Sequence, residues 1–96
     1  MKEKEETGYF SSLDGTKLFY RAWDKDVPDV LVIVHGFGEH SGRYLNLIES
    51  IGSQPYSIYV HDLRGHGHSE GPKVYVDRFI DYVNDVILFT DFIHII

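Results

Sequence analysis

The 96-residue chain has a mass of 11.1 kDa, a size typical of one small domain. Hydrophobic residues make up 43% of it and charged residues 25%, which excludes a disordered, collagen-like or coiled-coil chain. Fifteen acidic against nine basic residues give a formal net charge of −6, so we expect no nucleic-acid partner. The chain contains no cysteine, which excludes a disulfide framework and a thiolate zinc site.

The first residues are charged and lack the apolar segment of a signal peptide. The longest aliphatic run, residues 30–34, is too short to cross a bilayer. We therefore expect a cytoplasmic chain with no stable membrane span.

The N-terminal third predicts three strands. Residues 7–13 and 17–23 are rich in Tyr, Phe and Thr, and Asp14-Gly15 between them is typical of a hairpin turn, because glycine accepts a positive φ. Residues 30–34 (VLVIV) are apolar without alternation, which is typical of a strand buried on both faces in a parallel sheet.

The rest of the chain alternates helices and a strand. A helix is expected over about residues 43–53, with Ser41 as its N-cap, and a strand over residues 57–61. A second helix is expected over about residues 77–94, since apolar residues recur there at helical spacing and its acidic residues can form a solvated face. The apolar residues are Phe79, Ile80, Val83, Val86 and Ile87.

This order of elements predicts an α/β fold in which a β-hairpin is followed by β-α-β-α. A buried-type strand with no neighbour on one side leaves an apolar sheet edge open, which favours self-association. We therefore expect residues 1–96 to be an N-terminal fragment of a single, larger domain with an incomplete sheet.

Two Gly-rich loops follow the third and fourth predicted strands, and both carry long motifs. Residues 35–44 read HGFGEHSGRY, and residues 62–71 read DLRGHGHSEG. Together they resemble the N-terminal part of the α/β-hydrolase fold family, within its monoacylglycerol lipase and lysophospholipase-like (serine aminopeptidase-type) group. The resemblance implies a serine hydrolase that acts on a small-molecule or lipid-like carboxylic ester and uses no metal or cofactor.

The same resemblance implies that the backbone N–H of Phe37 is one donor of the oxyanion hole, with His35, Gly36 and Gly38 shaping its loop. A rigidly held backbone N–H stabilises charge that develops on a carbonyl oxygen. Two other readings of this loop stay open, a plain strand-to-helix turn and a dinucleotide site. The spacing G-x-G-x-x-x-G is one residue longer than the dinucleotide fingerprint, and Glu39 would repel a phosphate.

Residues 67–71 (GHSEG) match the G-x-S-x-G pattern of a serine nucleophile. That serine must join a strand directly to a helix, whereas Ser69 lies inside the second loop, well after His61. A histidine at position 94 would be on the order of 25 Å from the start of its helix, far from the contact that a triad needs. We therefore expect no nucleophile, acid or base in this chain, which would be a truncated hydrolase, inactive alone.

Histidines are concentrated in and next to the two loops. Five of them, together with Glu39 and Asp62, could act as metal ligands. A non-catalytic alternative therefore stays open, in which the chain is a metal-binding or interaction fragment that uses these loops or the exposed sheet edge. The histidines are His35, His40, His61, His66 and His68. We expect Asp62 and Arg64 to hold the second loop by hydrogen bonds and salt bridges.

Overall fold

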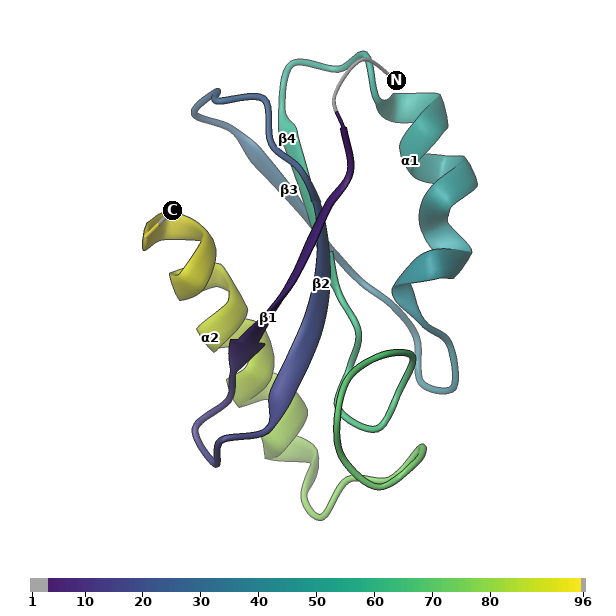
Figure 1. Cartoon of the computed structure of the whole chain (residues 1–96), viewed down its shortest axis with the longest axis vertical. Helices are drawn as coiled ribbons and strands as arrows, with labels where there is room; N and C mark the ends of the chain where they lie inside the picture. Colours follow the sequence, from purple (N-terminus) through teal and green to yellow (C-terminus); the bar gives the residue numbers. More distant parts are fainter. Residues whose placement is uncertain (1–3, 96) are drawn as a thin grey trace.

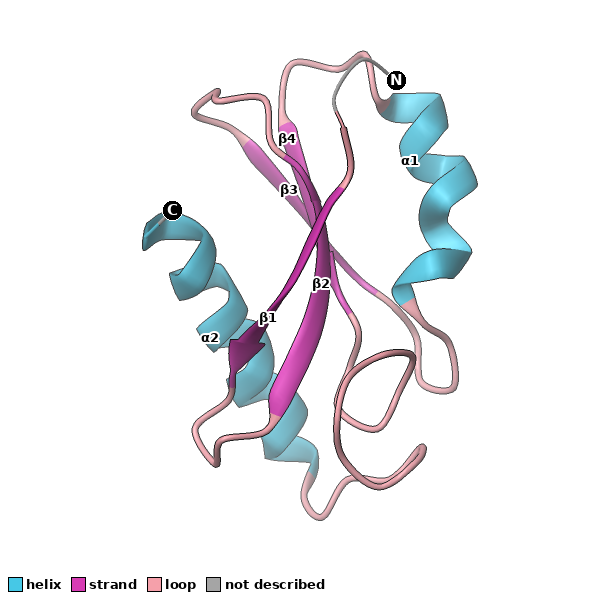
Figure 2. Cartoon of the chain, in the orientation of Figure 1, coloured by secondary structure: helices cyan, strands magenta, loops and turns pink. Residues whose placement is uncertain are grey.

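The computed structural model describes residues 4–95 and contains a single sheet between two helices (Figures 1 and 2). The strands are β1 (Glu6–Ser11), β2 (Lys17–Trp23), β3 (Val30–Val34) and β4 (Ser57–His61). A 3-10 helix, η1 (Ser41–Tyr44), leads into α1 (Leu45–Ile51), and α2 spans Phe79–Ile95. No helix in residues 4–95 has the length and apolar character to cross a membrane.

The strands are ordered β1-β2-β4-β3. β1 and β2 form an antiparallel hairpin, β2 pairs antiparallel with β4, and β3 pairs parallel with β4. The parallel pair is connected through α1, as a β-α-β crossover requires. The predicted α/β order of a hairpin followed by β-α-β-α is therefore confirmed.

The strand buried on both faces is β4, and the prediction that this strand would be β3 is wrong. All five residues of β4 are buried, whereas Val30 and Val34 at the ends of β3 are 40% and 48% exposed. The strand order gives the reason, because β4 lies between β2 and β3 while β3 pairs on one side only. An apolar run indicates a strand but does not tell how many neighbours that strand has.

Each face of the sheet packs against one helix. On the α2 face, Phe89 and Ile93 pack against side chains from β1, β2 and β4, namely Phe10, Leu18, Ala22 and Tyr59. On the α1 face, Ile48 packs with Trp23, Ile58 and Val60. The apolar side chains on each face of the sheet are thus buried against a helix. Removing this apolar surface from water is the main contribution that holds the helices on the sheet.

The inner face of α2 differs from the predicted apolar stripe. Asp85, which was expected on the solvated face, is fully buried and accepts hydrogen bonds from Arg64 and Ser12. Among residues 79–94 of α2 the buried side chains are Tyr82, Asp85, Phe89 and Ile93, while Phe79, Ile80, Val83 and Ile87 are exposed. The side of α2 that faces the sheet therefore includes Asp85, which is hydrogen-bonded there, and leaves several of the most hydrophobic residues of the helix exposed.

The first helix also begins differently from the prediction. Ser41 is the first residue of η1 and not an N-cap: His40 caps η1 by accepting the hydrogen bond from the Gly42 N–H, and Tyr44 stands at the N-cap of α1 without a side-chain hydrogen bond. Ser41 is fully buried and its hydroxyl accepts a hydrogen bond from Nε of Arg21. Ser41 therefore joins the loop to the sheet.

Candidate functional site

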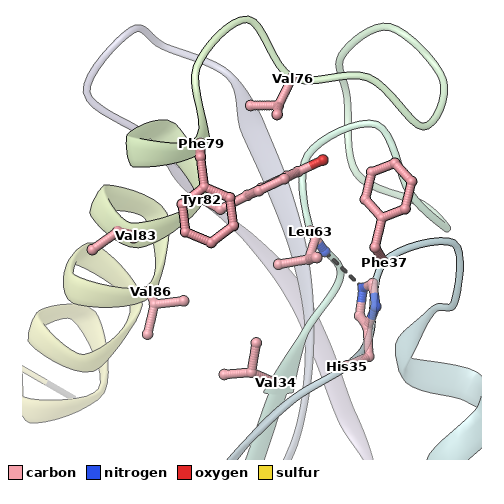
Figure 3. Close-up of a pocket in the computed structure, with 9 residues that line it drawn as sticks. All are labelled: Val34, His35, Phe37, Leu63, Val76, Phe79, Tyr82, Val83 and Val86. Carbon is pink, nitrogen blue, oxygen red and sulfur yellow. Dashed lines mark hydrogen bonds between the residues drawn. The ribbon is translucent and has the colours of Figure 1, made fainter.

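A pocket of about 530 Å³ opens at the carboxyl ends of the parallel strands, beside the start of α2 (Figure 3). Ligands of open α/β sheets bind at such strand ends, and the volume lies in the range of small-molecule sites. Its walls are mainly apolar and comprise Val34, His35, Phe37, Leu63, Val76, Phe79, Tyr82, Val83 and Val86.

Phe37 lies in the loop between β3 and η1 and contributes to the pocket wall, with a side chain that is 64% exposed. Within the part of the chain that the structure describes, its backbone N–H donates no hydrogen bond. The amides on either side do: the Gly36 N–H donates to Oε1 of Glu39 (3.0 Å), and the Gly38 N–H donates to Nε2 of His66 (2.9 Å). The loop thus leaves one amide free between two amides that are fixed.

His35 is buried at the base of this loop and connects it to the second loop. Its Nε2 accepts a hydrogen bond from the Leu63 N–H (2.9 Å, Figure 3), and its Nδ1 donates to the Gly36 carbonyl (2.7 Å). These partners assign the neutral tautomer with the proton on Nδ1. Burial lowers the pKa of His35 despite the opposing effects of the Gly36 carbonyl and of Asp62.

Glu39 closes the other side of the loop. Besides the Gly36 amide, its Oε1 accepts a hydrogen bond from the Tyr44 hydroxyl (2.8 Å), and Arg43 lies 3.8 Å from Oε2. The hydrogen bond from Tyr44, followed by the one from Gly36, lowers the pKa of Glu39. An ionised Glu39 therefore anchors Gly36 at neutral pH.

Asp62 begins the second loop and is buried. Its Oδ1 accepts a hydrogen bond from the Ser41 N–H (2.6 Å), and its Oδ2 accepts one from the His68 N–H (3.0 Å). Burial raises the pKa of Asp62, but the hydrogen bonds from His68 and Ser41 outweigh this effect and leave the pKa below its usual value. The prediction that Asp62 holds the loop is confirmed.

Arg64 ties the second loop to α2 and to the β1–β2 turn. Its guanidinium pairs with Asp85 (2.8 Å) and with Asp14 (2.8 Å), and it also donates to the Ser12 hydroxyl. The hydrogen bonds to Asp85 raise the pKa of Arg64, and the one from Arg64 lowers the pKa of Asp14. This confirms the predicted salt bridges of Arg64.

Ser69 has a hydroxyl that is engaged with backbone on both sides. It donates to the Asp62 carbonyl (2.6 Å) and accepts from the Phe19 N–H (2.8 Å), which attaches the second loop to β2. His94 is exposed in the last turn of α2. Within the described residues no imidazole nitrogen hydrogen-bonds this hydroxyl.

The five loop histidines are not brought together around one point. Among residues 4–95, no group of three or more His, Asp or Glu side chains could hold a metal ion. His35 and His66 are neighbours, with ring centroids 5.3 Å apart. His68 packs on Phe19, and His61 lies in the core of the α2 face.

His66 belongs to this candidate site through a contact that the sequence does not predict. It was considered as a metal ligand only, whereas the structure uses it to hold Gly38. The two residues are 28 positions apart, so no local pattern connects them. The sole signal was a histidine between two glycines in a loop at the same sheet edge.

Comparison with known proteins places this site in a family. The family model for serine aminopeptidases (S33) matches residues 25–95, which include both Gly-rich loops. A monoglyceride lipase homolog of Monkeypox virus is 41% identical over 83 residues, which are 84% of this chain and 30% of the relative. Human monoglyceride lipase is 41% identical over 80 residues, which are 81% of this chain and 26% of the lipase.

Solved structures agree on the fold. An esterase from Pyrococcus furiosus matches with a TM-score of 0.77 at 20% identity, over 93% of this chain and 35% of the esterase. The chain spans less than a third of the length of the two lipase relatives. The family match of the sequence and the fold match of the structure agree. The chain belongs to the serine aminopeptidase S33 family of α/β hydrolases.

Proposed function

We propose that this chain supplies part of the oxyanion hole of a serine hydrolase that acts on carboxylic esters of the monoacylglycerol or lysophospholipid type. The observation that carries the proposal is the N–H of Phe37, which has no hydrogen-bond partner among the described residues and stands between two fixed glycine amides. Phe37 itself lines the apolar pocket. The substrate class is supported by the relatives named as monoglyceride lipases.

In the proposed reaction, a serine attacks the ester carbonyl and negative charge develops on the carbonyl oxygen. The Phe37 N–H donates a hydrogen bond to that oxygen, and the loop needs no rearrangement to do so because Gly36 and Gly38 are held. The apolar pocket wall would contact the hydrocarbon part of the ester. Losing one such donor typically costs roughly 2.7–4 kcal/mol of transition-state stabilisation.

We also propose that the nucleophile, the acid, the base and the second oxyanion donor are not among residues 1–96. Ser69 is unsuited to attack, since its hydroxyl proton is committed to the Asp62 carbonyl and no imidazole is placed to remove it. The chain alone is expected not to hydrolyse esters, and a fluorophosphonate probe should leave Ser69 unlabelled. Rapid labelling of Ser69 would contradict this part of the proposal.

The oxyanion role can be tested in a chimera. The segment of human monoglyceride lipase that this chain matches is replaced by the present sequence, and Phe37→Pro is compared with Phe37→Ala. Proline removes the N–H, so kcat should fall by about 100- to 1,000-fold, whereas alanine keeps the N–H and should stay within about tenfold. Thermal unfolding curves check that both variants fold. An active proline variant would show that this amide does not stabilise the oxyanion.

A second candidate function is association with another polypeptide, including a second copy of the chain. The observation in its favour is that β3 pairs on one side only and has exposed valines at both of its ends. An open strand edge beside exposed apolar side chains is a template for adding another strand.

A further inference from the structure

Two buried histidines join the Gly-rich loops by a reciprocal exchange of hydrogen bonds. His35 of the first loop accepts from the Leu63 N–H of the second, and His66 of the second loop accepts from the Gly38 N–H of the first, both at 2.9 Å. We infer that His35 and His66 form a latch that sets the direction of the Phe37 amide, and that this latch holds only while both imidazoles are neutral. The inference rests on the proposed function for its catalytic meaning, but not for its geometry.

The two rings fix the two peptide planes that meet at Phe37. The first plane contains the Gly36 carbonyl and the Phe37 N–H, and Nδ1 of His35 donates to that carbonyl at 2.7 Å. A trans peptide unit is planar and rigid, so its carbonyl and its N–H point in opposite directions. Holding the carbonyl toward buried His35 therefore turns the Phe37 N–H away from that ring.

The second plane contains the Phe37 carbonyl and the Gly38 N–H. Nε2 of His66 accepts from that N–H, so this plane is fixed from the second loop. The edge of the His66 ring also packs against the Phe37 ring, with centroids 5.2 Å apart. With both planes held, the backbone at Phe37 has little freedom to rotate its amide inward.

Each latch hydrogen bond requires one tautomer. Nδ1 of His66 is 3.0 Å from the Arg64 carbonyl, and Nδ1 of His35 contacts the Gly36 carbonyl. A carbonyl oxygen only accepts, so both Nδ1 atoms carry the proton and both Nε2 atoms are bare. A protonated imidazole has no bare nitrogen and would lose its backbone donor.

The surroundings of His35 favour its neutral ring. Both rings are buried, and their centroids lie 5.3 Å apart. Around His35, burial outweighs the attraction of Asp62 and Glu39 and lowers the pKa of this imidazole, an effect to which His66 also contributes.

The other groups that face the two rings come from β4, α2 and the second loop. His61 at the end of β4 interacts electrostatically with His35, and the Tyr82 ring of α2 packs at 6.4 Å from the His66 ring. Arg64 contributes its carbonyl to His66, while its guanidinium is committed to Asp85 and Asp14.

The tautomers can be read directly from the full 96-residue chain. A long-range ¹H–¹⁵N correlation spectrum at neutral pH distinguishes the two ring nitrogens of each histidine. We expect His35 and His66 to show a protonated Nδ1 and a bare Nε2. A proton on Nε2 of either ring would overturn the inference, whatever the hydrolase experiments show.

Substitutions separate the latch from mere packing. In His66→Leu the Gly38 N–H loses its acceptor, and its hydrogen exchange should become about tenfold faster. In His66→Gln the side-chain oxygen can take the place of Nε2 and should restore most of the protection. His94→Gln, at an exposed histidine, is the matched control and should change nothing. If the Gly38 amide loses the same hydrogen-exchange protection in the Leu and Gln variants, His66 only fills space at this position and the latch is rejected.

An acid titration of the parent chain, followed by NMR, tests the latch without any substitution and so does not depend on whether a variant folds. The amide signals of Phe37 and Gly38 should move with the same midpoints as the rings of His35 and His66, while the amide of Leu47 on α1 stays constant. If the amide signals of Phe37 and Gly38 do not change as the rings of His35 and His66 become protonated, the latch is refuted. Because none of these measurements involves an ester, a failure of the latch and a failure of the proposed hydrolase function are distinguishable.

Discussion

His61 is a buried histidine whose two ring nitrogens both lack a hydrogen-bond partner among the described residues. It is fully buried at the end of β4, next to the rings of Phe10 and Phe89. Burial lowers the pKa of His61 to about 4 from the ordinary value of 6.5. At neutral pH the imidazole of His61 is therefore uncharged.

This buried imidazole predicts a pH-dependent stability. Between pH 6.5 and pH 4 the unfolded chain binds a proton at His61 that the folded chain does not, so stability is lost as the pH falls. The lowered pKa corresponds to about 3 kcal/mol over this window. In His61→Phe, which keeps an aromatic ring beside Phe10 and Phe89, this part of the pH dependence should vanish. Urea unfolding at pH 7, 5.5 and 4.5 measures it, and parallel pH profiles for variant and parent would disprove it.

The candidate site was predictable from the sequence only in part. His35, Gly36, Phe37 and Gly38 form one continuous motif after an apolar strand, so their place at the sheet edge follows from local pattern. The hydrogen bond from Gly38 to His66 depends on how two loops meet, which no local pattern encodes. The free state of the Phe37 amide is likewise a result of tertiary contacts.

At the scale of elements, the strands and helices were predictable because each has a local signal of its own. The hairpin and the parallel crossover were predictable as well, but the position of each strand within the sheet was not: β3 has the more apolar sequence, yet β4 lies inside the sheet. The face of α2 was misread for a similar reason. Asp85 is an acceptable core residue solely because Arg64 and Ser12 reach it from other elements.

The second loop gives a prediction about backbone conformation. Gly65 has φ +75°, and a Cβ placed there would overlap the Pro72 carbonyl oxygen. Gly15 in the β1–β2 turn has φ +85°, but a Cβ there would meet nothing within 4 Å. Gly15→Ala should therefore cost only the conformational strain, about 1 kcal/mol, and Gly65→Ala about 3 kcal/mol or more.

Urea unfolding of the two glycine variants and the parent measures this difference. Since both variants add the same methyl group at a positive φ, the comparison isolates the steric contact in the loop. Equal destabilisation would mean that the loop relaxes around Gly65 without losing contacts.

At the scale of the whole molecule, the open edge of β3 predicts self-association. Val34→Lys places a charge on that edge and should shift the chain toward the monomer, because edge lysines block strand addition. Leu47→Lys is the matched control, since Leu47 on α1 and Val34 are both 48% exposed and lie in different layers. Sedimentation velocity over a range of concentrations measures the effect. A parent chain that is monomeric throughout, or equal responses of the two variants, would contradict the prediction.

The attachment of Ser69 to the backbone changes how a routine mutagenesis result should be read. Ser69→Ala would detach the second loop from Asp62 and Phe19 and so disturb the loop that carries His66. In any assembly that contains this chain, an inactive alanine variant would therefore mimic the loss of a nucleophile. Only covalent trapping of the serine oxygen, and not a knockout, can identify which hydroxyl attacks.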